Sequence, residues 1–125
     1  MKVADSSFLI EALLRDASPL ENEDFIAPDL ALYEVVNTLW KHQVMIRDLE
    51  DAPVRIELFT DLTSNQRGQL LRPDTKLLAK AFALSVKHRI PTYDTIFVAL
   101  ALQLGLELKT HDGRQSSIFL QERHI

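Results

Sequence analysis

Cysteine is absent from this 125-residue sequence, and its absence excludes several kinds of site at once. Without thiols the chain can form no disulfide framework, thiolate zinc site, iron–sulfur cluster or cysteine nucleophile. No apolar run approaches the roughly 18 residues that a membrane-spanning helix needs. The first acid, Asp5, comes too early in the chain for a signal peptide. We therefore expect a cytoplasmic protein without a membrane partner.

Basic residues are in the minority, with 14 Lys and Arg against 18 Asp and Glu, and the net charge is −4. This balance argues against a simple basic protein that coats nucleic acid. The charge is also uneven, because residues 1–61 are acidic overall whereas residues 62–89 are basic. A cation site beside a track for an anionic substrate would produce this pattern, and so would an ordinary solvated surface.

The length predicts one domain, residues 1–125, in which short strands alternate with helices. Strands are expected at Lys2–Ala4, Phe25–Ala27, Leu106–Thr110 and Ser117–Leu120. Helices are expected at Phe8–Leu14, Asp29–Gln43, 48–62, Pro73–His88 and Thr95–Leu104, with a surface loop at 17–24 and a break at 64–68. This alternation predicts an α/β sandwich with a mainly parallel sheet.

Most of the acids need no explanation beyond solvation or helix capping, and Asp29 and Asp74 are expected caps. Asp5 differs, because it follows the first strand directly, and Asp112 comes two residues after the strand that ends at Thr110. Ligands of open parallel sheets bind beyond the carboxyl ends of the strands, so we expect both acids at that edge. Asp94 lies at the start of a helix among apolar residues.

Glu34 lies inside a predicted helix, and Asn37 follows it by one turn on the same polar stripe. The hypothesis of a site rests on four acids taken together. Each also has a simpler interpretation, as a helix cap (Asp5 and Asp94), a solvated helix position (Glu34) or a turn residue (Asp112).

Four blocks of the sequence resemble, in order, the four acidic motifs of PIN domains: Val3–Leu9, Pro28–Leu39, Tyr93–Ala101 and Leu108–Asp112. The order of the blocks and the chain length resemble the VapC-type toxins of toxin–antitoxin pairs. The resemblance spans residues 3–112. It implies a PIN-like three-layer α/β/α sandwich with a short central sheet, and it implies metal-dependent endoribonuclease activity.

The resemblance places Asp5, Glu34, Asp94 and Asp112 in the acidic cluster of the family. Asp5 and Asp94 are expected to bind Mg²⁺ (or Mn²⁺) directly, because both leave backbone turns on short side chains. Glu34 and Asp112 are expected to hold the metal directly or through water. Further expected contributors are three supporting polar residues and one phosphate contact: Ser7, Asn37, Thr110 and Arg114.

The partners that the resemblance implies are an RNA substrate, a cognate antitoxin protein and a second copy of the chain in a homodimer. Two other functions stay open. One is a phosphoryl-accepting or phosphatase α/β domain, although no second acid accompanies Asp5 at its strand end. The other is a catalytically inactive PIN-like domain that binds RNA or protein. The basic segment 67–89 could line an RNA track or form a solvated helix face.

Overall fold

A four-stranded parallel sheet forms the centre of the molecule in the computed structural model, which describes residues 1–123. The strands are β1 (Lys2–Ala4), β2 (Phe25–Pro28), β3 (Gly68–Leu71) and β4 (Leu108–Lys109), in the order β3-β2-β1-β4. The helices are α1 (Ser6–Leu14), α2 (Ser18–Glu21), α3 (Leu30–Trp40), α4 (Ala52–Ser64), α5 (Thr75–His88), α6 (Thr92–Leu104) and α7 (Gly113–Glu122). A π-helical segment, Lys41–Ile46, continues α3.

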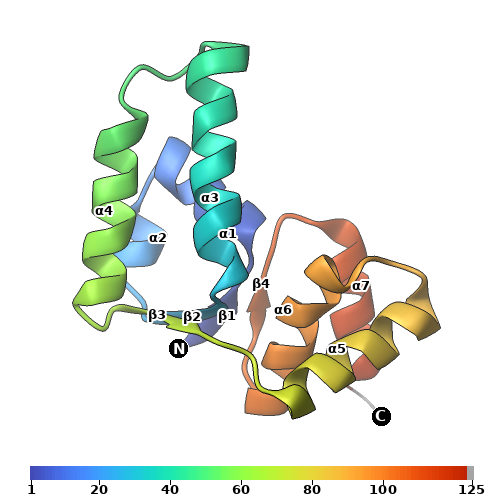
Figure 1. Ribbon diagram of the computed structural model, residues 1–125. Helices are drawn as coiled ribbons and strands as arrows, with labels where there is room; N and C mark the ends of the chain where they lie inside the picture. The colour runs from blue at the N-terminus through green and yellow to red at the C-terminus, as the bar shows by residue number, and fades with distance from the viewer. Residues whose placement is uncertain (124–125) are drawn as a thin grey trace.

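Helices cover both faces of the sheet (Figure 1). The helices α1 to α4 lie on one side, and α5, α6 and α7 lie on the other, where α6 contacts both β1 and β2. The central strands β1 and β2 are buried along their whole length, as strands covered on both faces must be. Residues 95–101 of α6 are also buried throughout, because other elements surround that helix. The predicted α/β/α sandwich with a parallel sheet is therefore confirmed.

The helix α6 begins at Thr92, three residues earlier than the sequence pattern predicts. Asp94 therefore lies inside the first turn, and Pro91 occupies the N-cap position. The predicted end of the helix is confirmed, since Gly105 adopts the left-handed conformation at φ 65° that favours glycine. Within residues 1–123 no helix has the length and apolar character needed to cross a membrane.

The strand predicted at Ser117–Leu120 is wrong, because these residues belong to α7. The Asp112 side chain accepts hydrogen bonds from the backbone N–H groups of Arg114 and Gln115 and so caps a helix there. The run Ile118–Leu120 is too short to separate a strand from a buried turn of helix. The expected loop at 17–24 holds the short helix α2, and β3 begins in the segment predicted as a break.

Candidate active site

Asp5 lies where β1 ends and α1 begins, between the neighbouring strands β2 and β4. Its carboxylate is 1% exposed and accepts three hydrogen bonds. Oδ1 accepts from the Phe8 backbone N–H at 2.9 Å and from the Ser7 hydroxyl at 2.7 Å. Oδ2 accepts from the Thr110 hydroxyl at 2.5 Å. Asp5 is thus a helix cap and also a fixed carboxylate at the carboxyl edge of the sheet.

Ser7 and Thr110 join the ends of β1 and β4 through side-chain hydrogen bonds. Strand pairing sets Ala4 opposite Lys109, so the residues that follow each strand meet. The Ser7 hydroxyl accepts from the His111 backbone N–H at 2.9 Å, and the Thr110 hydroxyl accepts from the Asp112 backbone N–H at 2.8 Å. This network holds the loop that carries Asp112 against the start of α1.

Glu34 reaches the same region from α3, which packs against α1 on the same side of the sheet. The Ser6 hydroxyl donates to Glu34 Oε1 at 2.5 Å. Burial raises the pKa of Glu34, and the hydrogen bond from Ser6 opposes that rise. The charges of Asp94 and Asp5 raise the pKa further, which means that all three carboxylates lie within electrostatic reach of one another.

Asp94 is a half-buried carboxylate on the first turn of α6. Burial raises its pKa most, and the negative charge of Asp112, followed by that of Asp5, raises it as well. Two groups on α7 lower the pKa: the guanidinium of Arg114, with Nη2 at 3.5 Å from Asp94 Oδ2, and the side-chain amide of Gln115. Asp94 is therefore within electrostatic reach of the three other acids, Asp5, Glu34 and Asp112.

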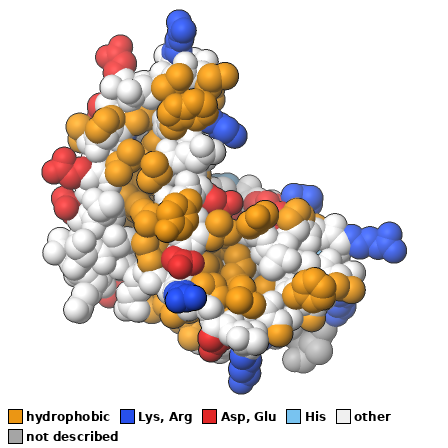
Figure 2. All heavy atoms as spheres, in the orientation of Figure 1, with side chains coloured by type: hydrophobic (Ala, Val, Ile, Leu, Met, Phe, Trp, Pro, Cys, Tyr) orange, Lys and Arg blue, Asp and Glu red, His pale blue; other side chains and the backbone are white. Residues whose placement is uncertain are grey.

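Within residues 1–123, Asn37 and the basic residues of segment 67–89 make no side-chain hydrogen bond or ion pair with the four acids. Asn37 is exposed on α3, and no side-chain hydrogen bond within residues 1–123 ties it to the acids. Lys76, Lys80 and Lys87 are exposed on α5, and Lys87 pairs with Glu122 at 2.7 Å. Figure 2 shows a few acidic side chains set among hydrophobic ones in the hollow between the two helical layers.

Ser6 and Gln115 contact the acids although the sequence reasoning did not single them out. Gln115 is 4% exposed, and its Oε1 atom is buried without a hydrogen-bond partner. The only feature of the sequence that could have pointed to Gln115 as a site residue is its position, three residues after the capping Asp112. Ser6 precedes the expected supporting residue Ser7 by one position, and its hydroxyl faces α3 instead of β4.

A divalent metal would find oxygen ligands here, but not a complete cage. Within residues 1–123 no three Asp, Glu or His side chains stand close enough to hold a metal ion by themselves. Mg²⁺ keeps several waters and needs only one or two direct carboxylates. Asp5 Oδ2 accepts one hydrogen bond and retains a second lone pair, and Asp94 is partly open to solvent. The donor set thus fits a partly hydrated hard cation.

The raised pKa values of Glu34 and Asp94 predict how stability depends on pH when metal is removed. Ionisation of either carboxylate is less favourable in the folded protein than in the unfolded chain. Their contribution to the free energy of unfolding is therefore greatest below the ordinary carboxyl pKa, where both are protonated. That contribution is lost as the pH rises through the raised values. In EDTA, Glu34→Gln should gain melting temperature relative to the wild type as the pH rises from 4 to 7. Glu57→Gln, an exposed change on α4, should show a constant difference.

The comparisons with known proteins agree with this geometry. A family model described as PIN domain matches residues 2–118. Ribonuclease VapC3 of Pyrobaculum aerophilum is 36% identical over 93 residues, which are 73% of this chain and 68% of that protein. The crystal structure of PAE2754 from Pyrobaculum aerophilum superimposes with a TM-score of 0.75 and 19% identity, covering 94% of this chain and 83% of that one. At that identity the structural likeness concerns the fold alone.

Proposed function

This chain belongs to the PIN-domain family, and from that premise we propose that it is a divalent-metal-dependent endoribonuclease of the VapC type. The observation that carries the proposal is that Glu34 and Asp94 have raised pKa values at one edge of the sheet, first through burial and then through neighbouring negative charges: Asp94 and Asp5 act on Glu34, and Asp112 and Asp5 act on Asp94. Negative charge gathered in this way is not neutralised by the protein itself. A cation, together with the phosphate that it attracts, relieves this repulsion.

Asp5 and Asp94 are the residues that we assign to hold Mg²⁺ or Mn²⁺, with Glu34 and Asp112 contributing directly or through water. Such a cation supplies an activated water and neutralises charge on the phosphoryl oxygens. Ser7 and Thr110 keep the Asp5 carboxylate in one orientation. Ser6 fixes Glu34, whose raised pKa suits a carboxylate that takes a proton from the attacking water. Asn37 completes the polar set on α3.

Water attack on phosphorus does not use the RNA 2′-hydroxyl, and it leaves a 5′-phosphate and a 3′-hydroxyl. The test is cleavage of a structured RNA with and without EDTA, followed by analysis of the product ends. We expect cleavage to stop in EDTA, to return with excess Mg²⁺ or Mn²⁺, and to yield 5′-phosphorylated products. Products that end in a 2′,3′-cyclic phosphate, or cleavage that survives chelation, would contradict the proposal.

Arg114 is the residue that we assign to contact the RNA phosphate. It is exposed, and its guanidinium already lies beside Asp94. Arg114→Gln should weaken RNA binding by about 3- to 10-fold at low salt and reduce the slope of log affinity against log salt by about one. Arg123→Gln removes an exposed arginine at the far end of α7 and is the matched control. An unchanged salt slope in Arg114→Gln would rule out the contact.

Exposed apolar side chains support the proposed protein partners, a cognate antitoxin and a second copy of this chain. Phe82 and Val86, 63% and 64% exposed, lie one turn apart on α5, and Trp40 and Met45 are exposed where α3 passes into the π-helical segment. An inserted Arg or Lys of an antitoxin could replace the cation among the carboxylates. These partners, and the cytoplasm as the place of action, belong to the proposal.

Phosphoryl transfer to an aspartate is a weaker candidate. Asp5 is the acid at the end of β1, yet it is 1% exposed and its Oδ1 atom already accepts two hydrogen bonds. A phosphoryl-accepting aspartate also needs a second acid beside it at the strand end, and the residues next to Asp5, Ala4 and Ser6, carry none. Cleavage in the assay above would likewise separate an active nuclease from an inactive RNA-binding or protein-binding domain.

A further inference from the structure

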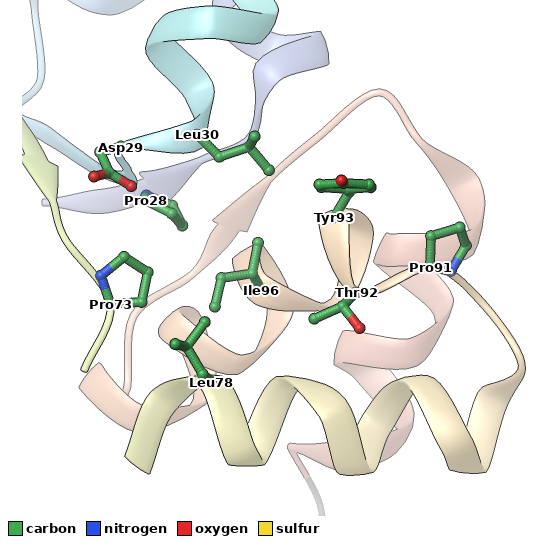
Figure 3. A pocket seen from close by; sticks show the side chains of 9 residues that line it. All are labelled: Pro28, Asp29, Leu30, Pro73, Leu78, Pro91, Thr92, Tyr93 and Ile96. Atoms are coloured by element: carbon green, nitrogen blue, oxygen red, sulfur yellow. The ribbon is translucent and has the colours of Figure 1, made fainter. Parts of the chain in front are cut away.

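A cavity of about 560 Å³ opens between the starts of α3 and α6, the helices that carry Glu34 and Asp94. This volume falls within the range of roughly 300–1,000 Å³ that small-molecule sites occupy. Figure 3 shows Asp29 and Leu30 on one side of the cavity and Thr92 and Tyr93 on the other, with Ile96 between them.

Each wall of the cavity belongs to a helix that also carries one of the proposed catalytic acids. Leu30 precedes Glu34 by one helical turn, so the two residues lie on the same face of α3. Tyr93 precedes Asp94 on the first turn of α6. The two helices that carry Glu34 and Asp94 therefore also border this cavity.

The lining of the cavity is suited to a flat aromatic ring. The Tyr93 ring is 67% exposed, and it lies across the hollow from aliphatic and proline side chains (Figure 3). Unpaired RNA bases are bound by stacking on aromatic side chains and by hydrogen bonds to their Watson–Crick edge. The exposed face of the Tyr93 ring supplies the stacking surface, and the aliphatic and proline side chains lie beyond the edge of the ring, where the edge of a stacked base would reach (Figure 3).

Asp29 supplies an uncommitted polar group at the other end of the cavity. Asp29 occupies the N-cap position of α3, as the sequence pattern predicts, but its side chain makes no capping hydrogen bond. Its backbone N–H instead donates to the Leu71 carbonyl at 2.8 Å and fixes the residue to β3. The half-buried carboxylate lines the cavity and has both oxygens available as acceptors.

We propose that this cavity binds an unpaired guanine of the RNA substrate, stacked on Tyr93 and hydrogen-bonded to Asp29. A carboxylate only accepts hydrogen bonds and can accept two in parallel. Guanine presents two adjacent donors, N1–H and the 2-amino group, on its Watson–Crick edge. Adenine and cytosine offer one amino group each, and the carbonyls of uracil repel a carboxylate. The proposal rests on the proposed function, because it takes RNA as the substrate.

Binding of mononucleotides tests the cavity without any cleavage, because 5′-GMP, 5′-IMP and 5′-AMP contain no phosphodiester bond. We expect 5′-GMP, titrated in Mg²⁺ and followed by NMR, to shift the backbone amides of Leu30 and Ile96 and to bind about 10-fold more tightly than 5′-IMP, which lacks the 2-amino group. Asp29→Asn should reduce this preference to less than about twofold, and Tyr93→Leu should weaken binding of all three purines by about 10-fold.

The matched controls are Asp61→Asn on α4 and Tyr33→Leu on α3, which change exposed residues outside the cavity lining and should bind like the wild type. Equal affinity for the three nucleotides, or a preference that survives Asp29→Asn, overturns the proposal even if RNA is cleaved. If Tyr93→Leu instead dissociates a dimer and leaves nucleotide binding unchanged, the cavity is a protein interface. Absence of RNA cleavage with intact 5′-GMP preference would overturn only the nuclease assignment.

Discussion

Replacing Asp94 with asparagine should abolish both RNA cleavage and the stabilisation of the protein by divalent metal. At a metal concentration about 100 times its Kd, binding to the folded state alone adds about 2.7 kcal/mol to the free energy of unfolding. For a domain of this size that corresponds to a rise of roughly 10 °C in Tm. Asp94→Asn removes an assigned ligand and one unit of negative charge while it preserves the shape of the side chain.

The physical reason for so large an effect is that the carboxylates repel one another in the metal-free protein, and a bound cation offsets this repulsion. The charge of Asp94 raises the pKa of Glu34, so neutral asparagine lowers the repulsion in the metal-free protein. We therefore expect Asp94→Asn to melt slightly above the wild type in EDTA at pH 7, but to gain nothing on addition of Mg²⁺.

Thermal melting in excess EDTA and in excess Mg²⁺ measures the first effect, and RNA cleavage measures the second. Loss of activity should exceed the roughly 10–100-fold that removal of a residue behind a metal ligand causes. The matched control is Asp61→Asn, an exposed change on α4 that should retain the metal-dependent rise and full cleavage. An Asp94→Asn protein with the full metal-dependent rise in Tm would refute the assignment of Asp94.

The positions of the strand-end acids could be predicted from the sequence because parallel strands impose a simple geometry. Asp5 and the segment Thr110–Asp112 follow β1 and β4, and these strands are neighbours in the sheet, so the residues meet. Strand order itself was not predictable, since β3 is a four-residue strand that lacks an alternating pattern. The catalytic roles of these acids remain predictions, whereas the family and the fold are established.

Other features depended on contacts that no local pattern encodes. The Asp29 side chain has the identity and position of a helix cap, but its backbone is helical, at φ −62° and ψ −19°, instead of extended as in a residue whose side chain caps a helix. Ser6 and Ser7 are adjacent and chemically identical, yet the helical turn sends one hydroxyl to α3 and the other to β1 and β4. Only the three-dimensional arrangement distinguishes such residues.

Gly68→Ala should destabilise the protein strongly, because no space exists for a methyl group at the start of β3. A Cβ atom there would lie 2.3 Å from Phe25 Cζ, and 2.7 and 2.8 Å from the two Cε atoms of that ring. The ring cannot withdraw, since Phe25 is fully buried and stacks on the buried Phe59 ring with centroids 6.5 Å apart. Overpacking of this kind costs about 3 kcal/mol, or roughly 10 °C in Tm.

Gly113→Ala is the matched control for this change. A methyl group added at this position, on the first turn of α7, would have no atom within 4 Å, so the substitution should be neutral or stabilise by about 0.5 kcal/mol through the unfolded state. Adding Phe25→Leu to Gly68→Ala should recover at least about 1 kcal/mol relative to the sum of the single changes, because the clash is between these two residues. A Gly68→Ala protein that melts within about 2 °C of the wild type would contradict the predicted clash.

Gly68→Ala should also affect the candidate active site, because β3 helps to position α3. Residues 25–28 of β2 pair in register with residues 68–71 of β3, and Leu71 at the end of β3 accepts the backbone hydrogen bond of Asp29. A displaced β3 therefore moves the start of α3, which carries Leu30 in the cavity wall and Glu34 at the acids. We expect the folded fraction of Gly68→Ala, measured well below its Tm, to cleave RNA more slowly than Gly113→Ala does. Equal rates would show that α3 is held in place independently of β3.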